Sequence, residues 1–314
     1  MAENSPCRYR MDTDSSATLI LPDGRTLGYA QYGLSDGPAV FYLHGLPGSR
    51  MEGALFDAPA ITPLARIIAV ERPGYGLSSP HPNRTILDHP KDVDFLARHL
   101  NIDSYAVLCI SGGGPYGLAC AASLPADRLK AVSIICGLGP PELGKKGMDW
   151  WHWLGFTIGF RYFPWACRWW FSRETFGRLD LTDQQRFDRF QKEWSKQKKS
   201  AHPKDVAALE DPDLVRWLVR NQREAYTQGF DGFAQDGRLS SWGFGFRIED
   251  IRKDLPIHLW YGKHDTHVPP SHGEGIAARM GPNSKARLRI EDETHGSLTW
   301  NCRVRALEDL LAAM

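Results

Sequence analysis

A serine followed by three glycines is the feature of this sequence that points most directly to chemistry. Ser111 comes after the apolar run 105–110 and is followed by glycines at 112–114. A serine on a tight turn between a strand and a helix holds its hydroxyl clear of the backbone, and small neighbours permit that conformation. The N–H groups that begin the next helix favour a developing oxyanion at the same point. Ser111 is therefore a candidate nucleophile. The alternative is a serine that only caps a glycine-rich helix start.

The elements around Ser111 follow the order of an α/β protein. Strands are predicted at 17–21, 26–32, 40–43, 67–70, 105–110, 131–136, 257–261 and 286–290. Helices are predicted over 86–100, 112–123 and 273–280, with a last helix on which Val304, Leu307 and Leu311 share one face. The first two strands form a hairpin through turn residues 22–25. Uniformly apolar strands that alternate with helices indicate a mostly parallel central sheet flanked by helices on both faces.

The alternation stops between residues 139 and 248, where aromatic and charged residues replace apolar strands. We therefore predict one α/β core, made of residues 1–138 and 249–314, with residues 139–248 inserted as a mainly helical cap. Six of the eleven tryptophans fall within 150–170. These aromatics either pack the cap onto the core or roof Ser111 as an apolar pocket. The residues expected to contact substrate there are Trp151, Trp153 and Phe156.

Three further segments, together with Ser111 and its glycines, resemble the α/β-hydrolase superfamily in content and order. They are residues 44–48 (HGLPG), 71–78 (ERPGYGLS) and 262–269 (GKHDTHVP). The similarity covers nearly the whole chain apart from the insertion, and it implies the α/β-hydrolase fold. It also implies the order nucleophile, acid, histidine, which Ser111, Asp265 and His295 satisfy, each after a predicted strand. The sequence departs from the family at Cys109, where glycine is usual, and cysteine is small enough to keep the turn.

The resemblance assigns a role to each member of this triad. Asp265 would fix the tautomer of His295 and stabilise its imidazolium, whereas the alternative is a loop aspartate that caps the next helix. His295 alone follows the last predicted strand and opens the final helix. It would take the proton from Ser111 and return it to the leaving group, and its alternative is a structural role.

Other site residues follow from the same resemblance. The backbone amides of Leu46 and Gly112 are implied as the oxyanion hole. His44 and His267 are expected to line the substrate pocket. The segment 71–78, in which Glu71 stands where the family commonly has Asp, is expected to brace the loops around the site.

Composition excludes several classes of function. Because 38 Lys and Arg nearly balance 37 Asp and Glu, no overall charge recruits nucleic acid, and a small, mostly uncharged substrate is expected. Charged residues and a proline interrupt the tryptophan-rich stretch, which excludes a spanning helix and stable membrane insertion, although surface association stays an alternative. The first ten residues show no secretory signal, and six scattered cysteines fit a reducing compartment. A cytoplasmic protein without a zinc site is expected.

These features predict a serine hydrolase that cleaves an ester, thioester or related acyl bond of a hydrophobic small molecule through an acyl-enzyme. No metal or organic cofactor is expected. The same triad on this fold also serves carbon–carbon bond cleavage, acyl transfer, elimination and cyclisation. A non-enzymatic small-molecule receptor is the alternative from another class.

Overall fold

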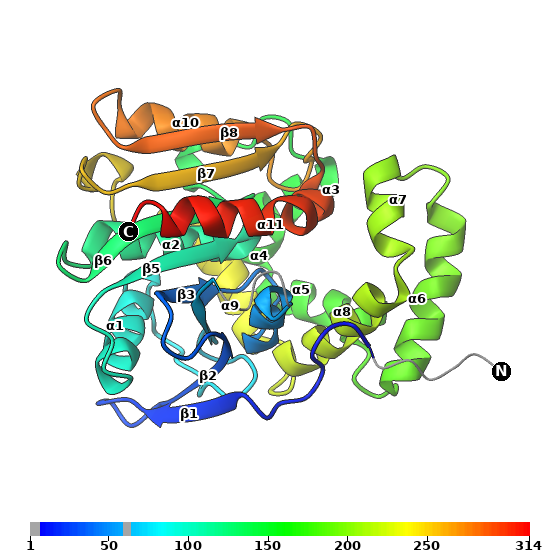
Figure 1. Cartoon of the computed structure of the whole chain (residues 1–314). Coiled ribbons are helices and arrows are strands. Elements are labelled where there is room, and N and C mark those ends of the chain that lie inside the picture. The colour runs from blue at the N-terminus through cyan, green and yellow to red at the C-terminus, as the bar shows by residue number, and fades with distance from the viewer. Residues whose placement is uncertain (1–6, 59–63) are drawn as a thin grey trace.

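The computed structural model describes residues 7–58 and 64–314, and its described strands form one eight-stranded sheet. In chain order the strands are β1 (Ser16–Ile20), β2 (Thr26–Gly33), β3 (Ala39–Leu43), β4 (Arg66–Val70), β5 (Tyr105–Ile110), β6 (Leu129–Ile135), β7 (Ile257–Gly262) and β8 (Ala286–Glu291). Their order in the sheet is β1-β2-β4-β3-β5-β6-β7-β8 (Figure 1). β2 pairs antiparallel with β1 and with β4, and the remaining neighbours are parallel. The predicted mostly parallel sheet is confirmed.

Helices cover both faces of this sheet. On one face pack α1 (His89–His99), α2 (Gly114–Ser123) and α10 (Ser271–Met280), and on the other pack α11 (His295–Leu311) and a 3-10 helix (Arg50–Phe56). Every residue of β3, β5 and β7 is buried. Burial on both faces explains why these strands are almost continuously apolar, with His258 on β7 as the polar exception.

Between β6 and β7 the described chain is helical. It forms α3 (Trp150–Leu154), a π-helix (Gly155–Gly159), α4 (Phe160–Tyr162), α5 (Pro164–Phe171), α6 (Asp183–Gln197), α7 (Pro203–Leu209), α8 (Pro212–Ala225) and α9 (Asp231–Ser240). Helices α6 and α7 stand to one side of the sheet (Figure 1). We call residues 139–248 the cap segment, and its standing as a separate unit stays a prediction.

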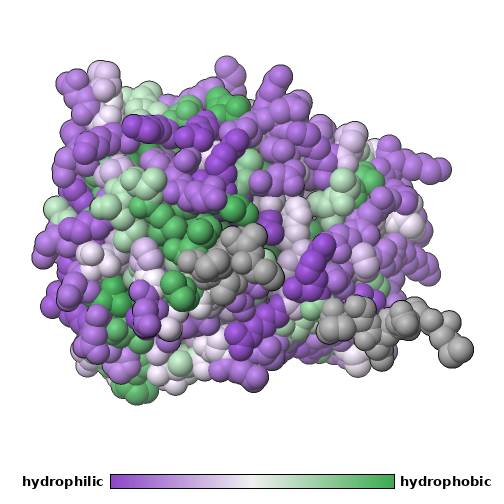
Figure 2. Space-filling model, viewed as in Figure 1, coloured by the Kyte–Doolittle hydropathy of each residue, from purple (hydrophilic) through white to green (hydrophobic). Residues whose placement is uncertain are grey.

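The surface seen in Figure 2 is largely hydrophilic, with a patch of apolar residues near the centre of the view. No helix in the described part of the chain is long and apolar enough to cross a bilayer. The candidate functional site lies at one edge of the central sheet. The carboxyl ends of the parallel strands meet at this edge, and in such sheets ligands bind to the loops that leave it.

Candidate active site

Ser111 lies on a sharp turn between β5 and α2. Its φ is 51°, in the left-handed region that L-residues rarely adopt. The turn requires glycine two residues later, because a Cβ added at Gly113 would lie 2.4 Å from the carbonyl oxygen of Leu43 on β3. The close approach of two strand ends thus holds the serine in its strained conformation, with its side chain at the sheet edge.

The cysteine that departs from the family pattern is accommodated inside this turn. Cys109 is fully buried in β5. Its Sγ occupies space that a side chain on α2 would need, since a Cβ added at Gly117 would lie 2.4 Å from that sulfur. A glycine on the helix therefore compensates for the missing glycine on the strand.

The structure brings Ser111, His295 and Asp265 into one hydrogen-bonded chain. His295 Nε2 lies 3.0 Å from Ser111 Oγ, and His295 Nδ1 lies 2.7 Å from Asp265 Oδ2. The other carboxylate oxygen, Oδ1, accepts the backbone N–H groups of His267 and Val268 at 2.8 Å each. Asp265 is thereby fixed in one orientation. The catalytic role of the three residues stays a prediction that this geometry supports.

The carboxylate sets both the tautomer and the charge of His295. Because an ionised Asp265 can only accept, it takes Nδ1–H and leaves Nε2 free to accept the hydroxyl proton of Ser111. Burial alone would lower the pKa of His295, but Asp265, reinforced by the sulfur of Cys136, raises that pKa well above its usual value. Cys136 Sγ lies 3.8 Å from Nε2. The arrangement stabilises an imidazolium, which is the form a general base adopts after taking a proton.

The two backbone amides expected to form the oxyanion hole lie next to each other. A Cβ added at Gly112 would lie 2.3 Å from the Leu46 Cβ and 2.9 Å from the Leu46 nitrogen. The carbonyl of Gly45 accepts from Arg72 Nη2 at 2.6 Å. Since the N–H and C=O of a trans peptide point in opposite directions, the N–H of Leu46 points away from Arg72. This placement suits an oxyanion hole, whose role stays a prediction.

His44 does not line the substrate cavity, which corrects the prediction made from its sequence position. Its side chain is fully buried behind the loop. Nε2 accepts the backbone N–H of Arg72 at 3.2 Å, so Nδ1 carries the proton that it donates to the Gly45 carbonyl at 2.9 Å. Burial and the nearby guanidinium hold its pKa well below the usual value. A neutral His44 thus helps to position the loop of residues 44–48.

Arg72 lies in the segment expected to brace the loops around the site, but the sequence did not reveal its partners. Its guanidinium also donates to the His44 carbonyl at 2.5 Å, and its charge is balanced by Asp236 on α9. Arg84 and the Tyr116 hydroxyl donate to the same carboxylate. Burial would raise the pKa of Asp236, but Arg72 and Arg84 together hold it far below its usual value. Asp236, a charged residue of the cap segment, is thereby joined through Arg72 to the loop of residues 44–48, which carries the Leu46 N–H.

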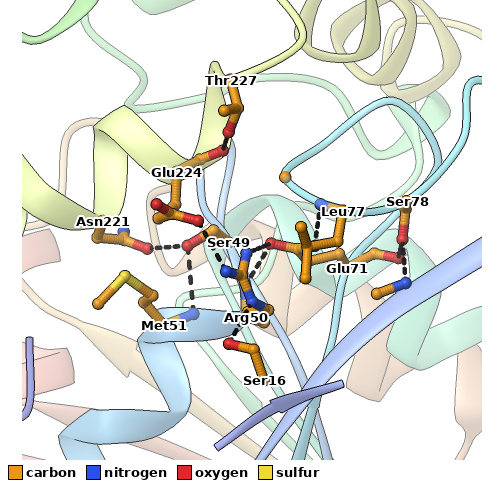
Figure 3. A network of polar contacts seen from close by, with 12 residues as sticks. Ser16, Ser49, Arg50, Met51, Glu71, Leu77, Ser78, Asn221, Glu224 and Thr227 are labelled. Atoms are coloured by element: carbon orange, nitrogen blue, oxygen red, sulfur yellow. Dashed lines mark hydrogen bonds and ion pairs between the residues drawn. The ribbon is translucent and has the colours of Figure 1, made fainter. Parts of the chain in front are cut away.

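A second buried network joins the cap segment to the core. Figure 3 shows Arg50 between two carboxylates, with Nη1 2.8 Å from Glu71 and Nη2 2.8 Å from Glu224 on α8. Glu71 also accepts the backbone N–H of Leu77 at 2.7 Å. The segment that begins at Glu71 is thus tied to both the core and α8, which fits its expected bracing role. Beside it, Ser49 donates to the side chain of Asn221 at 2.6 Å.

A cavity of about 390 Å³ opens above Ser111. The predicted residues Phe156 and His267 line it, together with the following residues that were not predicted: Glu52, His152, Leu214, Trp217 and Asn221. Glu52 is engaged in structure, because its carboxylate accepts from the Gly45 N–H and from the Tyr42 hydroxyl, each at 2.9 Å. Burial raises the pKa of Glu52.

Trp151 and Trp153 do not line this cavity, which corrects a second prediction. Both are nearly half exposed. His152 and Phe156, four residues apart, share the face that is turned to the cavity. Trp151 and Trp153 flank that face, so their side chains point elsewhere.

Two groups of metal-type donors occur among the described residues. One is Cys136 with Asp265 and His295, whose donor atoms take part in the contacts given above. The other is Asp149, His152 and His267 beside them. Asp149 Oδ2 lies 2.7 Å from His152 Nδ1, and the two histidine rings stack with centroids 4.2 Å apart. Desolvation and the adjacent imidazoles lower the pKa of His267 to about 4, so this ring is neutral at pH 7.

Two proline iminopeptidases are among the curated proteins similar to this chain. A proline iminopeptidase from Arabidopsis thaliana is 32% identical over 144 residues, which cover 44% of this chain and 36% of that protein. A proline iminopeptidase from Xanthomonas citri is 30% identical over 152 residues, 47% of this chain and 45% of that protein. The chain therefore matches less than half the length of either relative.

Solved structures match over nearly the whole chain. A hydrolase from Pseudomonas aeruginosa PA01 has a TM-score of 0.63 at 20% identity and covers 96% of this chain and 100% of its own. An enol-lactonase from Burkholderia xenovorans LB400 has a TM-score of 0.59 at 20% identity, covering 94% and 100%. At this identity the likeness establishes a shared fold. The family model described as alpha/beta hydrolase fold matches residues 38–301, so the chain belongs to the alpha/beta hydrolase fold family.

Proposed function

We propose that this protein is an enzyme, a serine hydrolase that cleaves an ester, thioester or related acyl bond of an apolar small molecule. The observation that carries the proposal is the hydrogen-bonded chain from Ser111 through His295 to Asp265 at the floor of a largely apolar cavity. Such a cavity, with few convergent polar groups, is typical of small-molecule sites.

The reaction proceeds in two stages. Ser111 Oγ attacks the carbonyl carbon while His295 Nε2 takes the hydroxyl proton, and the amides of Leu46 and Gly112 stabilise the oxyanion. The tetrahedral intermediate collapses as His295 gives that proton to the leaving oxygen or sulfur, which leaves the acyl group on Ser111. A water then loses a proton to His295 and attacks the acyl-enzyme. The second tetrahedral intermediate formed in this way collapses as His295 returns the proton to Ser111 Oγ, which releases the carboxylic acid.

Cleavage of a peptide bond after an N-terminal residue is a second candidate, since two relatives are named as proline iminopeptidases. Two carboxyl groups that could meet a substrate ammonium line the cavity, Glu52 and Asp205. The oxygens of Glu52 are already engaged by Tyr42, Gly45 and Asn221. Asp205 accepts the Thr294 hydroxyl through Oδ1. Turnover of proline amides compared with esters decides between the two candidates.

The experiment is covalent labelling with a fluorophosphonate, followed by turnover assays on esters of graded acyl length and on proline amides. Labelling that maps to Ser111 and disappears in Ser111→Ala, together with ester turnover, supports the proposal. A folded protein that is not labelled, or that binds esters without turning them over, contradicts it. Products of carbon–carbon cleavage, acyl transfer, elimination or cyclisation would assign the same triad to another reaction.

A further inference from the structure

Four tryptophans form an exposed surface on the cap segment, at the junction of α3 and α5. We call Trp150, Trp151, Trp169 and Trp170 the aromatic surface. The centroids of Trp150 and Trp151 lie 4.7 Å apart, and those of Trp151 and Trp170 lie 5.4 Å apart. Each side chain is more than 40% exposed, and Trp150 reaches 70%. Contiguous apolar surface of this kind marks a site of interaction, because a protein without a partner rarely exposes it.

Arginine side chains stack on tryptophans of the cap segment, and one of these tryptophans belongs to the aromatic surface. The guanidinium of Arg173 lies 4.1 Å from the ring centroid of Trp169, and that of Arg161 lies 4.0 Å from Trp242. Neither arginine forms an ion pair with any residue the structure describes. Residues 145–174 carry five Lys and Arg but two Asp and Glu. Asp231 on α9 pairs with one of the five, Arg168. The stretch that carries the aromatic surface therefore keeps an excess of positive charge, although the whole chain is nearly neutral.

A separate pocket opens beside these tryptophans and shares part of its wall with the catalytic cavity. It measures about 320 Å³ and is lined by Trp151, Trp169 and Trp170. Besides His152 and Cys167, its described lining residues are aromatic, aliphatic or glycine. His152 and Phe156 line both this pocket and the cavity above Ser111. An apolar molecule held here would contact two side chains that also line the catalytic cavity.

We propose that the aromatic surface docks the enzyme on an anionic lipid surface, from which an apolar ester enters through the tryptophan-lined pocket. The second half of this proposal rests on the hydrolase function proposed above. Tryptophan and arginine together suit the boundary between headgroups and acyl chains, and cations near a membrane are attracted by anionic lipid. A second copy of the chain fits this surface less well, because a symmetric contact would bring two copies of the same net positive surface together.

The test is sedimentation of the purified enzyme with vesicles of pure phosphatidylcholine and with vesicles that also contain phosphatidylglycerol. We expect tighter binding to the anionic vesicles. Arg173→Glu should weaken that binding at least about fivefold, from the contribution of one surface cation. Trp169→Ala with Trp170→Ala should weaken binding to both kinds of vesicle. Lys199→Glu and Ile20→Ser, at exposed positions outside the aromatic surface, are the matched charge and apolar controls, and should bind like the unchanged protein.

Ser111→Ala separates this proposal from the catalytic one. That variant should bind vesicles as well as the unchanged enzyme, so docking can hold or fail independently of the triad. The proposal is overturned if the enzyme binds neither vesicle type, or if the arginine and tryptophan variants bind like the controls. It is also overturned if ultracentrifugation shows a dimer that the tryptophan substitutions dissolve, since a second copy would then cover this surface. Arg173 is exposed, so its variant remains informative if the tryptophan variant does not fold.

Discussion

Asp236 on helix α9 forms a fully buried ion pair with Arg72, which stands 164 residues earlier and follows strand β4. Through Arg72 the cap segment reaches the carbonyls of His44 and Gly45, and hence the peptide that carries the Leu46 N–H. The orientation of one proposed oxyanion donor is therefore set in part by a helix outside the α/β core.

Asp236→Asn should lower the free energy of unfolding by about 3–5 kcal/mol, because it leaves the buried charge of Arg72 without its carboxylate. The matched control lies on the same helix: Asp231→Asn removes an exposed ion pair with Arg168 and should cost about 0–1 kcal/mol. Chemical denaturation of both variants measures the difference. If the two variants are equally stable, the buried pair does not join the cap segment to the core as described.

If Asp236→Asn keeps its fold, it should also lower kcat more than it changes KM. The loop that carries the Leu46 N–H should move, while the residues that line the cavity should stay in place.

Since the pKa of Asp236 is held far below its usual value, the contribution of Asp236 to stability is complete above the pKa of about 3.9 for an unfolded aspartate. It is lost as pH falls from there through the lower folded pKa.

The activity of the unchanged enzyme should rise with pH along a limb whose midpoint lies above 6.5. His295 must be neutral to accept the Ser111 proton, and Asp265 helps to raise its pKa well above the usual value. Asp265→Asn should reduce kcat by about 10⁴-fold, as the wrong tautomer becomes available, and move the residual limb to lower pH. Asp254→Asn, an exposed carboxylate paired with Arg252, is the control. An unshifted limb in Asp265→Asn would place the acid elsewhere.

Phe156→Ala should change substrate choice, whereas Trp153→Ala should not. Phe156 lines the cavity above Ser111, and Trp153 is exposed outside it. Loss of the ring should lower kcat/KM for large acyl esters by about 10-fold or more relative to an acetyl ester, a range typical for apolar pocket contacts. Equal losses on every ester would show that Phe156 assembles the catalytic groups instead.

Gly117→Ala should destabilise the enzyme by about 1–3 kcal/mol, because the added methyl overlaps the Cys109 sulfur. In a Cys109→Gly background the same change should be neutral or stabilise by up to about 1 kcal/mol, the helix propensity that alanine gains over glycine. The double-mutant cycle, measured by denaturation, isolates the contact. Additive effects would mean that helix and strand do not compensate each other here.

The sequence predicts what depends on local pattern and chain order. Apolar runs gave β5 its observed bounds, and strand ends placed Ser111, Asp265 and His295 in the loops that meet at one sheet edge. The partnership of Arg72 with Asp236 left no such signal, since a single aspartate in a polar helix has no pattern that names a partner 164 residues away.

The sequence also could not show which side chains face the cavity. Aromatics occur all around the stretch 150–171, so no apolar stripe identifies its inner face. The π-helix Gly155–Gly159 then changes the helical register inside that stretch. Packing against the core, which the local sequence does not encode, turned His152 and Phe156 inward and Trp151 and Trp153 away.

The left-handed backbone conformation of Ser111 lowers the stability of the fold, although it positions the side chain that we propose as the nucleophile. A residue with a side chain at φ 51° costs about 1–3 kcal/mol that glycine would not incur. Any search for sturdier variants that scores only melting temperature would therefore favour Ser111→Gly, which removes the proposed nucleophile while relieving the turn. Improvement of this enzyme by directed evolution should for that reason keep turnover in the screen at every round.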